Sequence, residues 1–303
     1  MPLDHVLCLL AHPDDELFCA GLLAHLSRRG IPIHLSFLTS GEGGGLRGHP
    51  EASPTTIAAY RKTEVECSAG VLGIEQISFM NYPDPSPKDR LIAPPHDPAR
   101  ILGELRTLIE QQAPTLVLTH GSNGDYGHPA HELLHQMSLR ALADMPGDTP
   151  ALFTFNAFHP SLPHPALLNE DDWADAIVDV SPMLPKKTAV LNCHASQWDA
   201  FVVPQPSDVD YRAAVARYVE QRLSSEGYCR QWPGTVRSSL VSLTDWLHTD
   251  GTLGVRTPKT SSGDQLRRYR HRVQLGLKRS LQWMRTGLIA ARNAIIRRRE
   301  RPS

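Results

Sequence analysis

The sequence contains little that would support a disulfide scaffold, a membrane span or a serine hydrolase. Its five cysteines are odd in number and form no C-x-x-C pair, so they indicate neither a disulfide framework nor a cysteine zinc site. No apolar run approaches the roughly 18 residues that a transmembrane helix needs. The N-terminal MPLDH lacks the basic stretch of a signal peptide, and no G-x-S-x-G elbow occurs. We therefore expect a reducing, cytoplasmic setting.

The near-neutral net charge of −1 hides two parts of opposite charge. Residues 264–303 hold twelve basic and two acidic side chains, which leaves 19 basic and 30 acidic side chains in the rest of the chain. Apolar residues recur every three or four positions from Leu266 to Ile295, a spacing that predicts a basic amphipathic helix. Such a helix could pack on the acidic body or on a sister subunit, or it could bind an anionic membrane at the inner membrane face. Nucleic acid is not expected as a partner, because no aromatic platform accompanies the charge.

The first 160 residues alternate between short apolar runs and segments of helical period. Strands are predicted at 6–11, 31–38, 76–80 and 115–119, with helices at 15–29, 57–72 and 98–112 between them. This alternation predicts a Rossmann-like α/β fold with a mostly parallel sheet flanked by helices. Further helices are expected near 186–201 and 211–225. We divide the chain into an α/β domain (1–248), a linker rich in Thr, Gly and Ser (249–263) and the basic tail (264–303).

Histidines and carboxylates follow the first and fourth predicted strands. The first strand runs into AHPDDE (residues 11–16), and the fourth into HGSNGDYGHPAH (residues 120–131). Ligands of such sheets bind beyond the carboxyl ends of the strands. Helix capping would explain the acidic residues but not the histidines. Two histidines and one carboxylate would instead suit a hydrolytic metal that keeps a water ligand.

These motifs resemble those of the PIG-L/LmbE-like zinc-dependent de-N-acetylases. The resemblance covers about residues 4–230 and includes LTSGEGG (38–44), R-x-x-E (61–64), YPD (82–84) and HASQ (194–197). It implies that Zn²⁺, or Fe²⁺ or Co²⁺ in its place, is bound by His12, Asp15 and His131.

The resemblance also implies roles for residues around the metal. Asp14 would be the general base, while His128 would stabilise the oxyanion or protonate the leaving amine, and Tyr126 would give a second donor. Substrate-binding roles fall on three further residues, which are Arg61, Asp84 and His194. The family often has an acid at the position of Ala130, which orients the preceding histidine, so a different partner for His128 is needed, and Asp125 is a candidate.

Two other motifs compete with this interpretation. His131, Glu132 and His135 form a literal H-E-x-x-H, the zincin peptidase signature. Pro129 places it in the first turn of its helix, and no further histidine continues the motif, so we interpret Glu132 and His135 as helix-surface residues. Gly43, Gly45 and Gly48 fit G-x-G-x-x-G, but a histidine and prolines follow where the dinucleotide fingerprint needs a helix. We expect an active-site loop there.

The sequence therefore predicts a metal-dependent hydrolase that removes the acetyl group from an N-acetyl-amino sugar unit of a glycoconjugate. A zincin peptidase is the alternative enzyme, and a non-enzymatic membrane-surface module is the alternative of a different class. The group attached to the sugar is left open, and a homo-oligomer is compatible with the sequence.

Overall fold

The structure is a computed structural model that describes residues 3–85, 91–163, 169–232 and 243–258. Its strands share one eight-stranded sheet, in the order β3-β2-β1-β4-β5-β7-β6-β8. The strands are β1 (Val6–Leu10), β2 (Ile33–Thr39), β3 (Gln76–Tyr82), β4 (Leu116–Thr119), β5 (Ala151–Thr154), β6 (Ala176–Asp179), β7 (Ser225–Trp232) and β8 (Gly254–Arg256). The first five in this order pair in parallel, and β7 joins β5 in the antiparallel sense. The predicted mostly parallel α/β sheet is confirmed.

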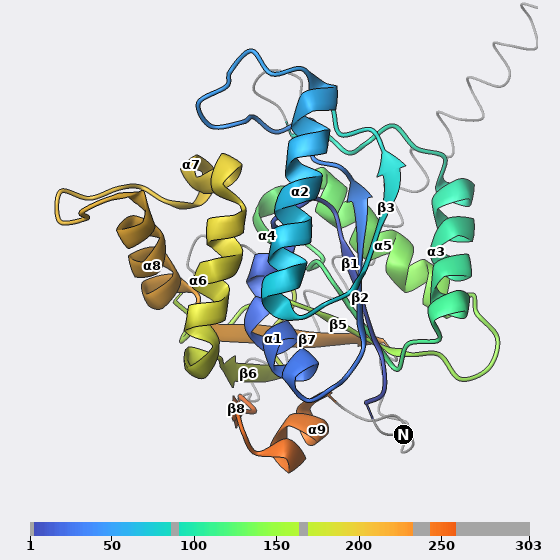
Figure 1. The fold of residues 1–303 in the computed structure, drawn as a ribbon. Coiled ribbons are helices and arrows are strands. Elements are labelled where there is room, and N and C mark those ends of the chain that lie inside the picture. Colours follow the sequence, from blue (N-terminus) through green and yellow to red (C-terminus); the bar gives the residue numbers. More distant parts are fainter. Residues whose placement is uncertain (1–2, 86–90, 164–168, 233–242, 259–303) are drawn as a thin grey trace, which may run out of the picture. The chain divides into compact units, whose positions relative to one another are not determined.

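Helices cover both faces of this sheet (Figure 1). The α-helices are α1 (Ala20–Arg28), α2 (Pro54–Leu72), α3 (Pro98–Gln112), α4 (Gly124–Gly127), α5 (Pro129–Ala143), α6 (Leu184–Cys193), α7 (Trp198–Phe201), α8 (Tyr211–Arg222) and α9 (Leu243–Asp250). Short 3₁₀ turns are η1 (Asp15–Cys19), η2 (Ser181–Met183) and η3 (Ala195–Gln197). The predicted single helix at 15–29 is thus a 3₁₀ turn followed by an α-helix.

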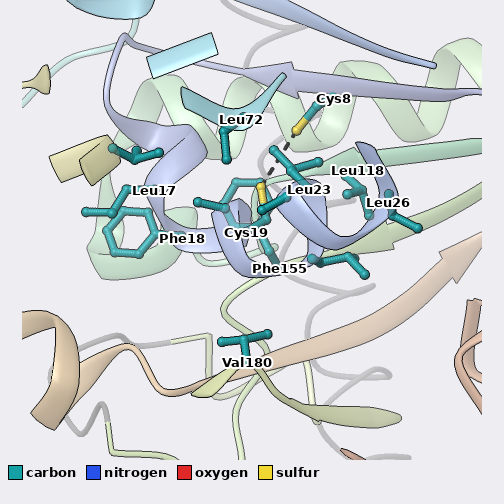
Figure 2. Close-up of a cluster of buried hydrophobic side chains, with 14 of the residues drawn as sticks. Cys8, Leu17, Phe18, Cys19, Leu23, Leu26, Leu72, Leu118, Phe155 and Val180 are labelled. Atoms are coloured by element: carbon teal, nitrogen blue, oxygen red, sulfur yellow. Dashed lines mark hydrogen bonds between the residues drawn. The ribbon is translucent and has the colours of Figure 1, made fainter. Parts of the chain in front are cut away.

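Strand β1 lies in the middle of the core because both of its faces are apolar. Val6, Cys8 and Leu10 face a hydrophobic cluster that includes side chains of α1, α2, α6 and α8. Leu7 and Leu9 face a second cluster with α3 and α5. Figure 2 shows part of the first cluster, where the thiols of Cys8 and Cys19 lie 3.9 Å apart. The continuous apolar run in the sequence therefore marks a strand that is buried on both sides.

Three features of the structure differ from the sequence-based expectation. Cys67 on α2 and Cys193 at the end of α6 form a disulfide across 126 residues of sequence, a pairing that cysteine spacing could not reveal. Strands β5 to β8 extend the sheet where no strand was predicted, because β5, β6 and β8 have only three or four residues and β7, although it has eight, mixes polar with apolar residues. The compact α/β unit reaches Pro258, so the predicted linker at 249–263 is wrong at its start.

The correction to the linker has a simple structural basis. Strand β8 pairs with β6 inside that range, with Val255 opposite Val178.

Among the described residues, no helix is long and apolar enough to cross a membrane. The predicted amphipathic helix at 264–303 lies outside the described residues.

Candidate metal centre and active site

The candidate site lies at the point where the strand order reverses. Strands β1 and β4 are neighbours although the chain passes through β2 and β3 between them. Their carboxyl ends therefore leave a crevice in which ligands of such sheets bind. Residues 11–16 follow β1, His120 follows β4, and His128 to His131 begin α5. The two sequence motifs are thus brought together at one edge of the sheet.

His12, Asp15 and His131 lie within contact distance of one another. His12 Nδ1 is 3.2 Å from His131 Nε2 and 3.5 Å from an Asp15 oxygen, and His131 Nε2 is 3.5 Å from the other Asp15 oxygen. Tetrahedral ligands about 2.0–2.2 Å from a zinc ion are separated by about 3.3–3.6 Å. All three side chains are buried. Among the described residues, two overlapping clusters of candidate metal ligands share His131, namely His12–His128–His131 and Asp15–His120–His131, so this part of the site can hold a divalent metal ion.

Asp125 fixes the ring orientation of His131. His131 Nδ1 donates to Asp125 Oδ2 at 2.8 Å, which leaves the Nε2 lone pair for a metal. Burial alone would raise the pKa of Asp125, but His120 and His131 lower it, so the carboxylate is ionised. Asn169 holds this carboxylate through its amide nitrogen at 2.9 Å and accepts a hydrogen bond from the Asp125 N–H at 3.0 Å.

His120 was not singled out from the sequence, although it adjoins His12, Asp15 and His131, the group of candidate ligands called the metal cluster from here on. Its Nδ1 donates to Asp125 Oδ2 at 2.6 Å, and its Nε2 accepts the Ala11 N–H at 2.9 Å. With both nitrogens occupied, His120 connects the ends of β1 and β4 rather than offering a ligand, although it lies near Asp15 and His131. The signal for His120 in the sequence was its place directly after a buried strand, in the same motif as His128 and His131.

His128 also lies beside the metal cluster, but its hydrogen bonding differs from that of a ligand. Its Nδ1 accepts the Ala130 N–H at 3.2 Å and caps α5, so the neutral ring carries its proton on Nε2. Burial, together with His12 and His131, lowers the pKa of His128 to about 3. The expected contact between Asp125 and His128 is wrong, since Asp125 serves His131 and His120 instead. With alanine at position 130, the His128 ring is held by the backbone N–H of Ala130, which donates to Nδ1, and not by a carboxylate.

A strained backbone presents the Asp14 carboxylate. Asp14 has a φ of +92°, a conformation that residues other than glycine rarely adopt. Arg61 contacts the Pro13 carbonyl and donates to Asp14 Oδ2 at 2.7 Å, while the Glu16 carboxylate accepts the Asp14 N–H at 3.0 Å. Burial raises the pKa of Asp14 to about 7, against the lowering effect of Arg61. This carboxylate can therefore hold or release a proton near neutral pH.

His194 does not lie where a substrate-binding residue should. It is fully buried, donates from Nε2 to Glu16 Oε1 at 2.6 Å, and is absent from the lining of the cavity described below. Ser68 donates to the same Glu16 oxygen at 2.6 Å. The predicted contact of His194 with substrate is therefore wrong, because its side chain is buried against Glu16 and does not reach the cavity. His194 supports Asp14 through Glu16.

The site opens into a cavity of about 750 Å³. Its polar lining includes His12, Asp14, Asp15, Arg61, Asp84, Tyr126 and His128. Asp84 Oδ2 accepts the Gly43 N–H at 3.2 Å, and Asp84 Oδ1 is 3.6 Å from His12 Nε2. Burial alone would lower the pKa of His12, but Asp15 and Asp84 raise it to about 9. In the metal-free protein the ring therefore carries a proton at neutral pH, and a metal that binds there must displace it. Of the three predicted substrate contacts, Arg61 and Asp84 reach the cavity.

The H-E-x-x-H motif does not form a zincin site. His135 is fully buried rather than on the helix surface, because α5 packs this face on the sheet, and its Nδ1 donates to the His120 carbonyl at 2.9 Å. Neither cluster of candidate metal ligands among the described residues includes His135 or Glu132. His131 alone of the three residues faces the metal cluster.

Replacing Asp125 by asparagine should weaken metal binding by about 10–100-fold. The amide carries no negative charge, and with its oxygen in the place of Oδ2 its NH₂ group would face the Asn169 NH₂ donor, so the hold on the His131 ring weakens. Competition with a chromophoric chelator gives the affinity. Asp144→Asn, a change on the surface, is the matched control and should leave it unchanged. Equal affinities of Asp125→Asn and the parent protein would show that Asp125 does not orient the ligand.

Known proteins resemble this chain in sequence and in fold. The family model described as "PIG-L: GlcNAc-PI de-N-acetylase" matches residues 7–142. A relative from Bacillus anthracis, named as a probable N-acetyl-alpha-D-glucosaminyl L-malate deacetylase 2, is 30% identical over 200 residues, which cover 64% of this chain and 81% of the relative.

Two solved structures share the fold. One is the N,N'-diacetylchitobiose deacetylase of Pyrococcus horikoshii, with a TM-score of 0.55, 19% identity, and coverage of 78% of this chain and 89% of that chain. The other is the 4-carboxy-2-hydroxymuconate hydratase GalB of Pseudomonas putida, with a TM-score of 0.56, 20% identity, and coverage of 78% and 99%. The fold thus carries two reaction types, whereas the match to the Bacillus relative is close enough to assign the family. The chain belongs to the PIG-L/LmbE-like family of metal-dependent de-N-acetylases.

Proposed function

We propose that this protein is a zinc-dependent hydrolase that removes the acetyl group from an N-acetyl-amino sugar unit of a glycoconjugate. The observation that carries the proposal is the trio of His12, Asp15 and His131, with donor separations of 3.2–3.5 Å beside the Asp14 carboxylate. Nitrogen and oxygen donors in this number suit Zn²⁺, and Fe²⁺ or Co²⁺ would also fit. A cation there supplies Lewis-acid polarisation of the acetyl carbonyl and lowers the pKa of water.

In this proposal Asp14 moves the proton. Its carboxylate lines the cavity next to the trio and is ionised above a pKa of about 7. It takes a proton from the attacking water while the water oxygen bonds to the carbonyl carbon. The carbon–nitrogen bond then breaks as the nitrogen receives from Asp14 the proton that Asp14 took from the water. The products are the free amino sugar and acetic acid, which loses its proton to solvent as acetate, and Asp14 is again ionised. Arg61 keeps the carboxylate aimed at the cavity.

His128 and Tyr126 would stabilise the negative charge that develops on the acetyl oxygen. His128 is neutral and carries its proton on Nε2, so it acts as a hydrogen-bond donor and does not need to be an imidazolium. The pKa of Tyr126 is raised by burial and by the nearby Asp15 and Asp14. Its hydroxyl therefore stays protonated and can donate a hydrogen bond. The two rings lie 5.8 Å apart at the cavity wall.

Asp84 is the residue we propose to bind the sugar. Its side chain lines the cavity and carries a lowered pKa, since His12 and Arg61 outweigh the effect of burial. An ionised carboxylate there accepts hydrogen bonds from sugar hydroxyls. Arg61 lines the same cavity, but its two terminal nitrogens are bound to Gly41, Pro13 and Asp14.

The substrate assignment is tested by acetate release. The Bacillus relative is named for an N-acetylglucosaminyl compound, so the panel contains N-acetylglucosamine, its methyl glycoside and N,N'-diacetylchitobiose, each with zinc-loaded protein. We expect one free amine for each acetate released, with no release from protein treated with chelator. Acetate release from none of the three sugars would contradict the proposed function.

The charge split in the sequence supports a separate proposal about location. Residues 264–303, with twelve basic and two acidic side chains, would bind an anionic membrane surface. We expect the full chain to sediment with vesicles that contain phosphatidylserine at low salt and to be released at high salt, whereas residues 1–263 stay in the supernatant. If the full chain also stays in the supernatant at low salt, this proposal is wrong.

A further inference from the structure

The cavity that contains the metal cluster has a second, apolar wall. This wall consists of aromatic and aliphatic side chains, namely Phe18, Phe201, Val202, Val203 and Tyr218. They come from three separate parts of the chain, which are η1, the end of α7 with the residues after it, and α8. Figure 2 shows Phe18 beside Leu17 among the buried side chains at the edge of the core.

The members of this wall contact one another and lead to the surface. The ring centroids of Phe18 and Phe201 are 6.1 Å apart, and those of Phe201 and Tyr218 are 6.4 Å apart. Phe18 follows the metal-cluster residue Asp15 by three positions, so the wall begins next to the cluster. Val203 is 80% exposed and marks the mouth of the cavity. An apolar path therefore runs from the metal cluster to solvent.

Charged residues of α8 at the same cavity have partners within the chain. Arg217 donates to both Asp208 oxygens, at 3.0 and 2.8 Å, and Arg222 donates to the Pro163 carbonyl at 3.2 Å. Burial raises the pKa of Tyr218, so its ring stays neutral. These cations are thus paired within the chain, and Phe18, Phe201 and Val202 offer apolar surface to a ligand in the same cavity.

A single amino sugar does not account for this wall. A cavity of about 750 Å³ falls in the range of roughly 300–1,000 Å³ that holds drug-sized ligands, so space is left beyond one sugar ring. Sugar hydroxyls require polar partners, which Asp84 and its neighbours at the metal end provide. Apolar side chains gain when they cover apolar surface and remove it from water.

We propose that this wall is a subsite for an apolar aglycone, so that the substrate class is an N-acetyl-amino sugar glycoside with an alkyl or aromatic aglycone. The inference rests on the proposed function and specifies its substrate. It also differs from the Bacillus relative, whose name specifies an L-malate conjugate, a polar group that this wall would not complement. Phe201, Val203 and Tyr218 lie outside residues 7–142, the part that matches the family model.

The test compares β-glycosides of N-acetylglucosamine that carry methyl, butyl, hexyl or phenyl groups, each monomeric in solution, with zinc-loaded full-length protein. Burial of one methylene changes binding by about two- to fourfold. We expect kcat/KM to rise at least tenfold from the methyl to the hexyl glycoside, mainly through a lower KM, and the phenyl glycoside to show a similar gain. Equal kcat/KM values across the series would overturn the inference.

Val203→Asp places a charge in this wall at a position that is too exposed to affect folding. It should reduce the advantage of the hexyl over the methyl glycoside at least fivefold. Val209→Asp is the matched control, because Val209 is 91% exposed and is not among the lining residues. Phe201→Ala should act in the same direction as Val203→Asp.

The outcomes separate the two proposals. If the methyl glycoside is deacetylated and the hexyl glycoside brings no gain, the apolar subsite is wrong and the proposed function stands. If the gain persists unchanged in both Val203→Asp and Phe201→Ala, the aglycone does not bind along this wall. If no glycoside releases acetate, both proposals are wrong.

Discussion

Replacing Asp15 by alanine should abolish metal binding and acetate release together, with activity reduced by at least about 10³-fold. Asp15 is the only carboxylate of the proposed ligand trio. It also accepts the backbone N–H of His12 at 2.6 Å, so its loss removes a negative charge and a hydrogen bond that holds the loop after β1. Elemental analysis of the purified variant gives the metal content, and an enzymatic acetate assay gives the activity. A variant that keeps both metal and activity would show that the metal is held elsewhere.

Two further variants keep this result interpretable. Asp15→Asn keeps the shape of the side chain and an oxygen for the His12 N–H, so it separates loss of the ligand charge from a folding defect. It should fold with a thermal midpoint near that of the parent and still lose most of its activity. Glu132→Gln tests the zincin alternative, in which Glu132 is the base for peptide cleavage. It should keep its deacetylase activity.

Replacing Asp14 by asparagine should lower kcat by about 10²–10⁴-fold while the metal content stays unchanged. Asparagine tolerates a positive φ better than most residues, so the strained backbone at this position is preserved. The amide cannot accept the proton from water, and this is the step that the carboxylate is proposed to perform. Steady-state kinetics on the methyl glycoside, together with metal analysis, measure both quantities. A kcat within a factor of three of the parent value would exclude Asp14 as the base.

The pH dependence of kcat provides a second readout for Asp14. Because burial raises its pKa to about 7, activity should increase with pH as the carboxyl loses its proton, and the positive charge of a bound metal would move this limb to lower pH. Arg61 lowers the same pKa, so Arg61→Gln should move the limb to higher pH. A limb at the same pH in Arg61→Gln and the parent protein would contradict this assignment.

Local sequence patterns were sufficient to predict the centre of the fold. The apolar run that forms β1 is buried on both faces, and a continuous apolar run is typical of strands in parallel sheets covered on both sides. The motif histidines and carboxylates lie together because β1 and β4 are neighbours, an order that the α/β alternation alone does not specify. Strands β5 and β6 have four residues each, and their positions depend on pairing with distant segments such as β7. Patterns within a short window carry no information about such pairing.

The site was predictable where a residue acts directly and not where it acts through another. His12, Asp15 and His131 are expected as metal ligands from the resemblance of their motifs, and the structure brings these three side chains close together. His194 was assigned to substrate from its motif, yet its partner Glu16 lies 178 positions earlier in the sequence. Asn169 likewise supports Asp125 from a distance of 44 positions. Their roles depend on tertiary contacts that only the structure supplies.

The central claim is that one metal ion, bound at His12, Asp15 and His131, makes this protein a deacetylase. The most direct test is a titration of metal-free full-length protein with Zn²⁺, in which acetate and free amine released from the methyl glycoside of N-acetylglucosamine are measured. We expect both products to appear in equal amounts and the rate to saturate at one equivalent of zinc, with Asp15→Ala inactive at every ratio. Activity in the metal-free protein, or release of acetate by Asp15→Ala at the parent rate, would contradict the account.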